Sequence, residues 1–476
     1  MENWLIKRAK MSPNQLGLVF NDTCWTFKEL ETDATQLATA ITSQSPTLQR
    51  VAVLGRNHAD FYLLLLALHL LQVEVVVLNN RLTAGEIAQQ LTIATPDCVI
   101  VDPLFHDKLK DCSCPVLDLT ELRQITTEGL TYTHKPIELN NVATIMFTSG
   151  TTGVPKGVKQ TYQNHFSSAT GSALNVGMTP DDKWLLTVPL FHISGYSMMM
   201  KSLIYGNTVC LVEKFNPTLI CQLIKEASIT HISLVPTMLT ALLKVPDFAK
   251  NKDSLRCVLL GGAPLTVAQL EEAHALDLPI IQSFGMTETA SQVIALNARD
   301  AKRKIGSSGQ PLFPVELQIE DPNEDGIGEI LIKAPNVSPG YINAEMIKTT
   351  DGFLKTGDLG YLDEEGFLYV VGRKKELIIS GGENIYPLRV ENALLTTSQV
   401  KEVAVTGEPD EYWGEIVTAY IVLHPGLSFD EELIKQEIDG MVAHYKQPKR
   451  YYVIDELPRN SLGKLVKRKL PEMVEK

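Results

Sequence analysis

Basic residues are in the minority in this chain. The 476 residues include 43 Lys and Arg against 56 Asp and Glu, which leaves a formal net charge of −13 at pH 7. A molecule with this charge has no general attraction for nucleic acid or for an anionic membrane. We therefore expect no nucleic-acid partner, and an anionic ligand would have to be held by a local site.

Long apolar segments are also missing. The longest apolar run, Phe61–Leu71, is interrupted by His69 and is much shorter than the ~20 residues that span a bilayer. The N-terminal segment, Met1–Gln15, lacks the apolar core of roughly 7 to 15 residues that a secretory signal requires. We therefore expect no transmembrane segment and a protein that remains in the cytoplasm.

Cysteine is too scattered for a disulfide framework or a zinc site. The seven cysteines form an odd set, and Cys112-Ser-Cys114 has no second cysteine pair or histidine pair nearby to complete a tetrahedral site. Reduced structural thiols, as in cytoplasmic proteins, are the expected state.

The composition is that of a globular protein, with 44% hydrophobic and 21% charged residues. This excludes a disordered, collagen-like or coiled-coil chain, and the length predicts two or more domains. Short apolar runs alternate with amphipathic segments, which predicts βα units around parallel sheets. One series comprises Ala143–Phe147, Trp184–Val188, Thr208–Val212, His231–Leu234, Arg256–Leu260 and Pro279–Phe284, and an earlier layer system comprises Val51–Leu54, Val73–Leu78 and Cys98–Val101.

The pattern changes at about residue 315. The closely spaced runs Val315–Ile319, Glu329–Ile332 and Phe367–Val371, with Gly, Asp and Pro between them, predict a small antiparallel sheet. The charged stretch Gly372–Glu376 marks a boundary. We expect an α/β protein with a large N-terminal domain, 1–373, and a small mobile α+β domain, 374–476, whose basic tail beyond Lys464 is mobile. The oligomeric state is left open, with a homo-oligomer possible.

The most informative segment is Thr148–Gly157 (TSGTTGVPKG), which follows an apolar run. Glycines let successive backbone N–H groups converge on an anion, and the hydroxyls and Lys156 add donors, so the segment predicts a phosphate-binding loop. It is not a Walker A loop, because Pro155 stands where that motif requires glycine. A flexible polar hairpin is the alternative.

This loop resembles the signature of the adenylate-forming superfamily, which includes acyl-CoA synthetases, luciferases and peptide-synthetase adenylation domains. Further motifs of the family follow in order over nearly the whole chain: Pro189–Gly195, Gly261–Pro264, Ser283–Thr289, Thr356–Asp358, Gly372-Arg373, Ser380–Pro387 and Pro458–Lys464. The resemblance implies that ATP activates a carboxylate as an acyl-AMP with release of pyrophosphate, and that a thiol such as coenzyme A then accepts the acyl group.

The resemblance also implies roles for individual residues. Lys464 would bridge the substrate carboxylate and the nucleotide, which brings a cation to two repelling anions. Thr287 would meet the α-phosphate, Glu288 would bind Mg²⁺, and a single carboxylate suffices where phosphates supply other ligands. The remaining ATP-binding residues are Thr148, Ser149, Gly150, Thr151, Thr152, Gly153 and Lys156 for the phosphates, Gly261, Gly262, Ala263, Pro264 and Phe284 for adenine, Asp358 and Arg373 for the ribose, and Gly285 and Thr289.

In this family the C-terminal domain rotates between the two half-reactions. Lys375 occupies the hinge position, and Gly381 and Gly382 would leave room for pantetheine on the thiolation face. His192 would border the acyl pocket and move between the two steps, although a capped structural histidine before Gly195 is the alternative.

The acid is suggested by one lysine in an apolar helical pattern, Tyr196–Ile204. Lys201 either extends to solvent or meets an anion, since burying an unpaired ammonium is costly. Five segments resemble acid–CoA ligases that act on 2-succinylbenzoate, an aromatic dicarboxylate of menaquinone biosynthesis: Leu174–Pro180, Asp182–Trp184, Lys201–Gly206, Gly285–Gln292 and Lys304–Leu312. We assign Ser283 and Ser291 to this pocket, with Gln292 as a neighbour.

Three alternatives remain at this point. The first is a general aryl or medium-chain acyl-CoA synthetase, and the second is an adenylation enzyme that loads a carrier protein. The third is a non-catalytic nucleotide-binding protein that has kept the fold.

Overall fold

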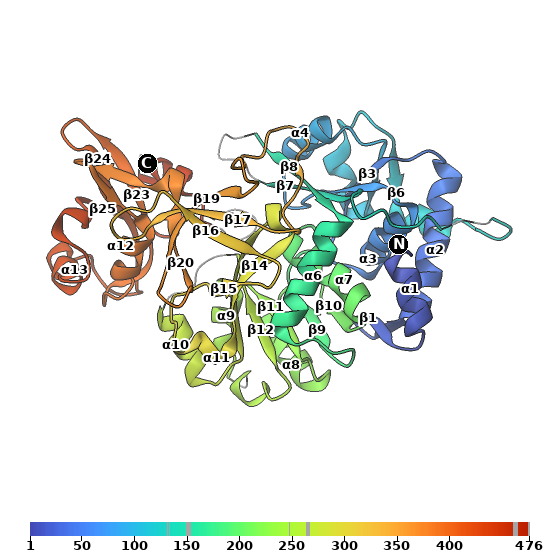
Figure 1. Ribbon diagram of the computed structural model, residues 1–476, viewed down its shortest axis with the longest axis horizontal. Helices are drawn as coiled ribbons and strands as arrows, with labels where there is room; N and C mark the ends of the chain where they lie inside the picture. Colours follow the sequence, from blue (N-terminus) through green and yellow to red (C-terminus); the bar gives the residue numbers. More distant parts are fainter. Residues whose placement is uncertain are drawn as a thin grey trace. The chain divides into compact units, whose positions relative to one another are not determined.

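The largest sheet is built from βα units, as the alternating apolar runs predict. The computed structural model describes residues 1–130, 132, 134–148, 154–246, 248–262, 267–459 and 465–474. Nine strands pair in the order β15-β14-β13-β12-β11-β9-β10-β1-β2, and the six from β13 to β1 are parallel (Figure 1). Their bounds are β1 Leu16–Phe20, β2 Thr23–Thr26, β9 Lys183–Leu186, β10 Thr208–Leu211, β11 His231–Leu234, β12 Cys257–Leu260, β13 Ile280–Met286, β14 Ser291–Leu296 and β15 Gln310–Pro311.

A second sheet has seven strands in the order β18-β8-β7-β4-β3-β5-β6. The strands from β7 to β6 are parallel, whereas β8 and β18 continue the sheet in antiparallel pairing. Their bounds are β3 Arg50–Leu54, β4 Glu74–Val77, β5 Cys98–Val101, β6 Val116–Asp118, β7 Val142–Thr148, β8 Lys156–Thr161 and β18 Gly340–Tyr341.

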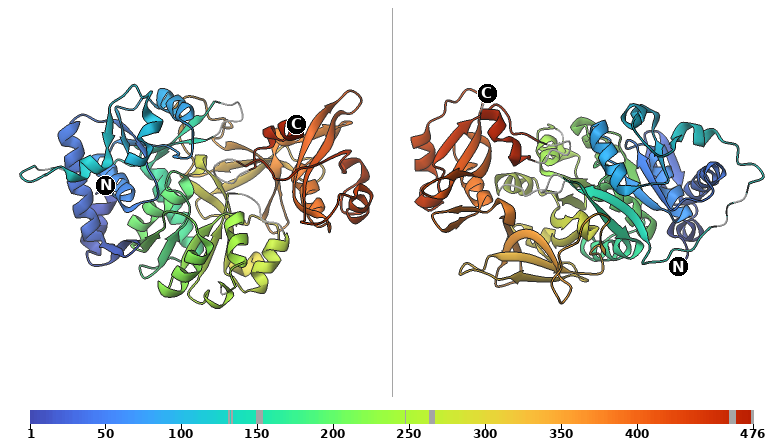
Figure 2. Two further views of the ribbon diagram at one scale, coloured as in Figure 1. Left: turned by 180° about the vertical axis from the view of Figure 1, so that it is seen from behind. Right: turned by 90° about the horizontal axis from the view of Figure 1, so that it is seen from above.

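Helices connect the strands of these two sheets (Figure 2). They are α1 Trp4–Met11, α2 Phe27–Gln44, α3 Ala59–Leu71, α4 Ala84–Ala94, α5 Leu119–Gln124, α6 Tyr162–Val176, α7 Ile193–Tyr205, α8 Pro217–Glu226, α9 Pro236–Leu243, α10 Val267–Ala275 and α11 Ala298–Ala301, with short 3₁₀ turns η1 Pro103–Leu109, η2 Phe248–Lys250 and η3 Thr287–Thr289. Helix α3 is buried on all sides, which explains why its sequence is almost uniformly apolar. No helix among the residues described is long and apolar enough to cross a membrane.

The C-terminal part contains two smaller sheets. The antiparallel sheet predicted beyond residue 315 has the order β16-β17-β19-β20, and a mixed five-stranded sheet follows it. The bounds are β16 Glu316–Glu320, β17 Gly328–Lys333, β19 Leu354–Leu362, β20 Leu368–Arg373, β21 Ile378–Ser380, β22 Glu383–Ile385, β23 Val400–Asp410, β24 Gly414–Leu423 and β25 Arg450–Val453, with α12 Pro387–Leu394, α13 Glu431–Glu437, α14 Pro471–Val474, η4 Lys374–Glu376, η5 His444–Lys446 and η6 Lys467–Lys469.

The chain divides into two compact units. The first comprises residues 1–316 and 332–354, and the second comprises residues 317–331 and 355–476. Most of the antiparallel sheet falls in the second unit, in which Ile327, Leu359 and Val371 share a buried cluster with Tyr386. The boundary predicted after residue 373 therefore lies inside the second unit, and the hinge near Lys375 stays a prediction.

Two expectations need correction. The sequence pattern groups the run Ala143–Phe147 with the later strands, but β7 pairs with β4 in the other sheet, since apolar rhythm indicates a strand without indicating its neighbour. The tail beyond Lys464 is expected to be mobile, but its described residues, 465–474, pack against other residues of the second unit. Leu470 is fully buried, and Lys467 forms ion pairs with Glu391 at 2.8 Å and Glu376 at 3.2 Å.

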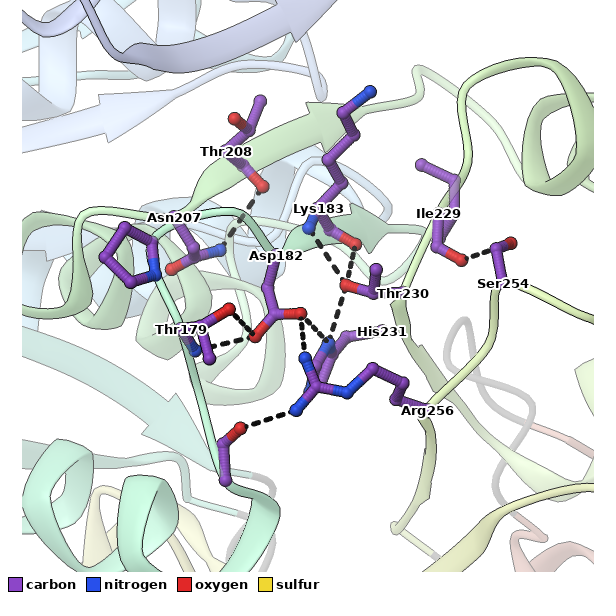
Figure 3. Close-up of polar contacts among 12 residues, drawn as sticks. Thr179, Asp182, Lys183, Asn207, Thr208, Ile229, Thr230, His231, Ser254 and Arg256 are labelled. Atoms are coloured by element: carbon purple, nitrogen blue, oxygen red, sulfur yellow. Dashed lines mark hydrogen bonds and ion pairs between the residues drawn. The ribbon is translucent and has the colours of Figure 1, made fainter.

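A buried polar cluster ties the amino ends of three parallel strands together (Figure 3). Asp182, 1% exposed and next to β9, accepts hydrogen bonds from Arg256 Nη1 at 2.6 Å and from the Thr179 backbone N–H at 2.6 Å. His231, the first residue of β11, lies 3.7 Å from the same carboxylate. The cluster lies at the amino ends of the strands, whereas Gly261 and Gly262 follow the carboxyl end of β12. We therefore assign it to stability.

Buried histidines predict an acid-sensitive fold. His69 contacts the hydroxyls of Tyr162 and Tyr196, and burial lowers the pKa values of His69 and His165 to about 3 each. The unfolded chain, with histidine pKa values of about 6.5, then binds more protons below that pH. Stability should therefore fall between pH 6.5 and 3, by about 1.4 kcal/mol per pH unit for each such histidine.

Urea unfolding between pH 7 and 5.5 measures this dependence before most carboxylates titrate. His165→Gln should reduce the slope of the unfolding free energy against pH by the contribution of one histidine. A slope that is the same in this variant and in the parent would contradict the prediction.

Candidate active site

The predicted nucleotide motifs of the first unit lie where strands end. Thr148 ends β7 and pairs with Lys156 at the start of β8, so the phosphate loop connects two adjacent antiparallel strands. Gly261 and Gly262 follow β12, and the Ser283–Thr289 motif spans the end of the neighbouring β13. The carboxyl edge of a parallel sheet is the usual ligand site of α/β folds. Eight predicted residues lie outside the described residues: Ser149, Gly150, Thr151, Thr152, Gly153, Ala263, Pro264 and Lys464.

The turn after β13 has a strained and closely packed backbone. A Cβ atom on Gly285 would lie 2.2 Å from the Ser291 carbonyl oxygen, so only glycine fits there. Ala290 and Ser291 have positive φ angles of 49° and 107°. Such conformations cost about 1 to 3 kcal/mol each and cluster at functional sites. The Thr289 hydroxyl is taken up in the turn itself, since it contacts Met286 N–H at 3.0 Å and the Ser291 carbonyl at 2.7 Å.

Glu288 is held by a residue that the motifs did not reveal. The Tyr341 hydroxyl donates to Glu288 Oε1 at 2.9 Å, and Lys156 Nζ lies 5.1 Å from the centre of the Tyr341 ring. Burial, with the nearby carboxylate, raises the pKa of Tyr341, so the phenol stays protonated as a donor. The half-buried Glu288 carboxylate suits Mg²⁺, which takes one or two carboxylates beside phosphate oxygens.

The adenine-side residues lie on β12 and β13. Phe284 is half-buried and not part of the fully buried core, which leaves ring surface for stacking. The Ser283 hydroxyl donates to the Leu260 carbonyl at 2.9 Å and lies against Gly261, where a Cβ would approach its oxygen to 3.0 Å. Ser283 therefore ties β13 to β12 at the edge of the predicted adenine site.

Lys201 does not extend to solvent. It lies on α7, is 2% exposed, and its Nζ is 5.9 Å from the centre of the Trp184 ring. We find no hydrogen bond or ion pair from this ammonium to any residue in the part of the chain that the structure describes. Burial lowers the pKa of Lys201 to about 8. The group therefore retains most of its positive charge at neutral pH, and no carboxylate of the described residues pairs with it.

Ser291 and His192, two other predicted acid-pocket residues, lie near the same helix, whereas Ser283 lies against β12. Ser197, one turn before Lys201, contacts the Ser291 hydroxyl at 3.4 Å. His192 precedes the first residue of α7, and its side chain forms no hydrogen bond that caps the helix. Its role at the acyl pocket stays a prediction. Gln292 is buried and donates to the Ser172 hydroxyl at 3.2 Å, which assigns its amide N–H to packing against α6.

The second unit contains the predicted ribose and thiolation residues. Asp358 on β19 faces Arg373 on β20, with Arg373 Nε 2.8 Å from Asp358 Oδ1. Lys375 is exposed in η4, between β20 and β21. Gly381 and Gly382 form the turn after β21 with positive φ angles of 59° and 87°, and a side chain at Gly381 would clash with the Trp413 ring at 2.8 Å.

The match to known proteins covers the whole length. The model of the AMP-binding enzyme family matches residues 5–342, and that of the AMP-binding enzyme C-terminal domain matches residues 389–464. A 2-succinylbenzoate–CoA ligase of Listeria monocytogenes is 44% identical over 476 residues, 99% of each chain. Another of that name, from Bacillus subtilis, is 41% identical over 99% of this chain and 97% of its own length.

Solved structures agree with these relatives. An o-succinylbenzoate CoA synthetase of Bacillus subtilis, in complex with its acyl-adenylate intermediate, is 40% identical with a TM-score of 0.92, covering 99% of this chain and 98% of that one. The same enzyme with ATP and magnesium ion has a TM-score of 0.92 over 99% of both chains at 40% identity.

The fold and these motifs define an adenylate-forming enzyme, in which the acidic turn Thr287–Thr289 follows β13 and the segment between β7 and β8 carries the phosphate-loop motif. The chain belongs to the AMP-binding enzyme family, which confirms the family predicted from the motifs. The two family models leave residues 343–388 between them, and the predicted boundary after residue 373 lies in that interval.

Proposed function

We propose that this protein is an ATP- and Mg²⁺-dependent ligase that joins 2-succinylbenzoate to coenzyme A. The observation that carries the choice of acid is the buried ammonium of Lys201, which has no anionic partner among the described residues. A dicarboxylate supplies one carboxylate for activation and one for Lys201. The names of relatives at 41 to 44% identity support the same acid.

The reaction has two steps. One carboxylate oxygen attacks the α-phosphorus of ATP, the bond to the pyrophosphate leaving group breaks, and an acyl-AMP forms. The CoA sulfur then attacks the acyl carbon, and AMP leaves. Mg²⁺, when bound, offsets the negative charge of the phosphates.

Residues of this chain have distinct tasks in these steps. Lys464 reduces the repulsion between the attacking carboxylate and the α-phosphate, and Thr287 donates to that phosphate. The phosphate loop with Lys156 holds the β- and γ-phosphates, Asp358 and Arg373 hold the ribose, and Glu288 offers its carboxylate to the metal. His192 borders the acyl group. Lys375 is the hinge, and Gly381 and Gly382 admit pantetheine.

We place the reaction in the cytoplasm, where ATP and CoA are both available. The seven cysteines, which form no disulfide in the structure, fit a reducing compartment.

Pyrophosphate release tests the proposal. Release should require MgATP together with 2-succinylbenzoate, and it should proceed in a single turnover without CoA. Release that needs neither acid nor CoA, or no release with any acid, would contradict it.

The pH dependence of acid binding follows from Lys201. Only the ammonium form attracts a carboxylate, and the pKa of Lys201 in the free protein is about 8. Above this pH, kcat/KM for 2-succinylbenzoate should fall about tenfold per pH unit, because the charged fraction falls by that factor. Steady-state rates from pH 6.5 to 9.5 measure the profile. In Lys201→Met this fall of kcat/KM at high pH should be absent. An identical fall in both proteins would show that another group titrates.

A further inference from the structure

The backbone of the Thr287–Thr289 turn is held at three consecutive carbonyl oxygens. Gln160 Nε2 donates to the Thr287 carbonyl at 2.8 Å, the Ser338 backbone N–H donates to that of Glu288 at 2.8 Å, and Asn336 Nδ2 donates to that of Thr289 at 2.9 Å. Gln160, Asn336 and Ser338 are buried. Hydrogen bonds from buried residues therefore hold the backbone of the turn that carries Thr287 and Glu288.

Gln160 is the end of a longer buried chain of hydrogen bonds. Its Oε1 accepts from the Thr144 hydroxyl at 2.7 Å, and the Thr144 oxygen lies 3.0 Å from His165 Nε2. Gln160 and Thr144 are completely buried on neighbouring strands β8 and β7, and His165 is on α6. Water does not replace a lost partner easily at such a place, so each group depends on the next.

Counting protons determines which group donates in each of these hydrogen bonds. The single Thr144 hydroxyl proton goes to Gln160, so Thr144 must accept from His165, whose Nε2 carries the proton. The amide of Gln160 is then oriented with its oxygen toward Thr144 and its N–H toward Thr287. The opposite orientation would set two carbonyl oxygens against each other. Hydrogen bonds aligned in one direction polarise and strengthen one another.

We propose that His165, Thr144 and Gln160 form a positioning relay that holds the Thr287–Glu288 peptide for adenylation. Fixing the Thr287 carbonyl fixes the plane of that peptide and hence the direction in which the Glu288 side chain leaves the backbone. Gln160 touches neither substrate nor metal and acts through Thr287 and Glu288. The inference rests on the proposed function, because it assumes that these two residues serve MgATP.

The relay also connects two motifs that are far apart in the sequence. Gln160 lies on β8, which begins at Lys156 of the phosphate loop, whereas Thr287 lies 127 residues later. A shift of β8 therefore moves the phosphate loop and the acidic turn together. Keeping both in one geometry matters because a small misplacement of reacting groups can cost about 10²-fold in rate.

Three kinds of variant test the relay. Gln160→Leu and Gln160→Met each lose both the acceptor for Thr144 and the donor to Thr287 while keeping an apolar side chain of similar size. Thr144→Val interrupts the relay one step away, while Thr144→Ser keeps the hydroxyl. The matched control is Gln163→Met, because the Gln163 amide donates at 2.8 Å to Ser167 on the same helix and not to the turn.

We expect the two Gln160 variants to form acyl-AMP about 10- to 100-fold more slowly in a single turnover, the usual effect of losing a residue that orients a metal ligand. The affinity for MgATP, measured by titration calorimetry, should weaken within the same range, whereas the affinity for ATP without magnesium, which depends on Thr287 and not on Glu288, should weaken less. Thiolysis of preformed acyl-AMP should be unchanged. Thr144→Val should show the same pattern more weakly, and Thr144→Ser and Gln163→Met should match the parent.

Two results would overturn the relay. One is unchanged adenylation and MgATP affinity in both Gln160 variants. The other is an equal loss of adenylation and thiolysis, which marks a general structural defect. If the parent protein itself does not adenylate 2-succinylbenzoate, the proposed substrate fails, and the MgATP titrations still decide the relay.

Discussion

Replacing Lys464 by alanine is expected to slow acyl-AMP formation by about 10²- to 10³-fold, the usual effect of losing one preorganised group at a developing charge. The attacking carboxylate and the α-phosphate are both anionic, and in the proposed mechanism Lys464 is the cation that reduces their repulsion. Thiolysis of preformed acyl-AMP joins no such pair of anions at this position. It should keep its rate in Lys464→Ala, and rapid-quench measurement of the two half-reactions separates the effects.

The control for this variant is close by in the sequence. Lys469 is exposed in η6, so Lys469→Ala removes the same charge from the same segment and should change neither step. An equal loss of both half-reactions in Lys464→Ala would contradict the assigned role.

The second large effect is expected for the acid. Lys201→Ala should raise KM for 2-succinylbenzoate by about 10- to 150-fold, because a hydrogen bond to a charged group contributes about 1.5 to 3 kcal/mol. KM for ATP should stay nearly the same. Steady-state kinetics with each substrate varied in turn measures both constants.

Two controls separate charge from packing. Lys201→Met keeps most of the apolar stem and should show the same rise in KM. A mono-acid analogue, which lacks the carboxylate that meets Lys201, should have the same KM in parent and variant. An unchanged KM for 2-succinylbenzoate would remove Lys201 from the pocket.

A helix or strand could be predicted wherever its own short segment of sequence indicates it. His231–Leu234 matches β11 because a short apolar run between turn residues is sufficient to indicate a buried strand. The partner of a strand depends on contacts far along the chain, which is why β7 was grouped with the wrong sheet. The cluster of Ile327, Leu359, Val371 and Tyr386 likewise joins segments that look separate in the sequence.

The same limit applies to the candidate site, where residues within a motif could be predicted but their partners far along the chain could not. Glu288 could be predicted from its motif, but Tyr341, which bonds to it, stands 53 residues later and belongs to no motif that we recognised. One signal for Gln160 was present. Residues alternate sides along a strand, so Gln160 shares a side with the buried Val158 and is a buried polar group in need of partners. Its partners, however, come from β7 and from the turn after β13.

The most direct test of the acid–CoA ligase is thioester formation, followed by mass spectrometry. The protein would be incubated with MgATP, CoA and a panel of 2-succinylbenzoate, benzoate and fatty acids of several lengths. We expect the CoA thioester of 2-succinylbenzoate to form in preference to all others. Faster formation of a fatty or simple aryl thioester would contradict the proposed substrate, and transfer only to a carrier protein would contradict CoA as the acceptor.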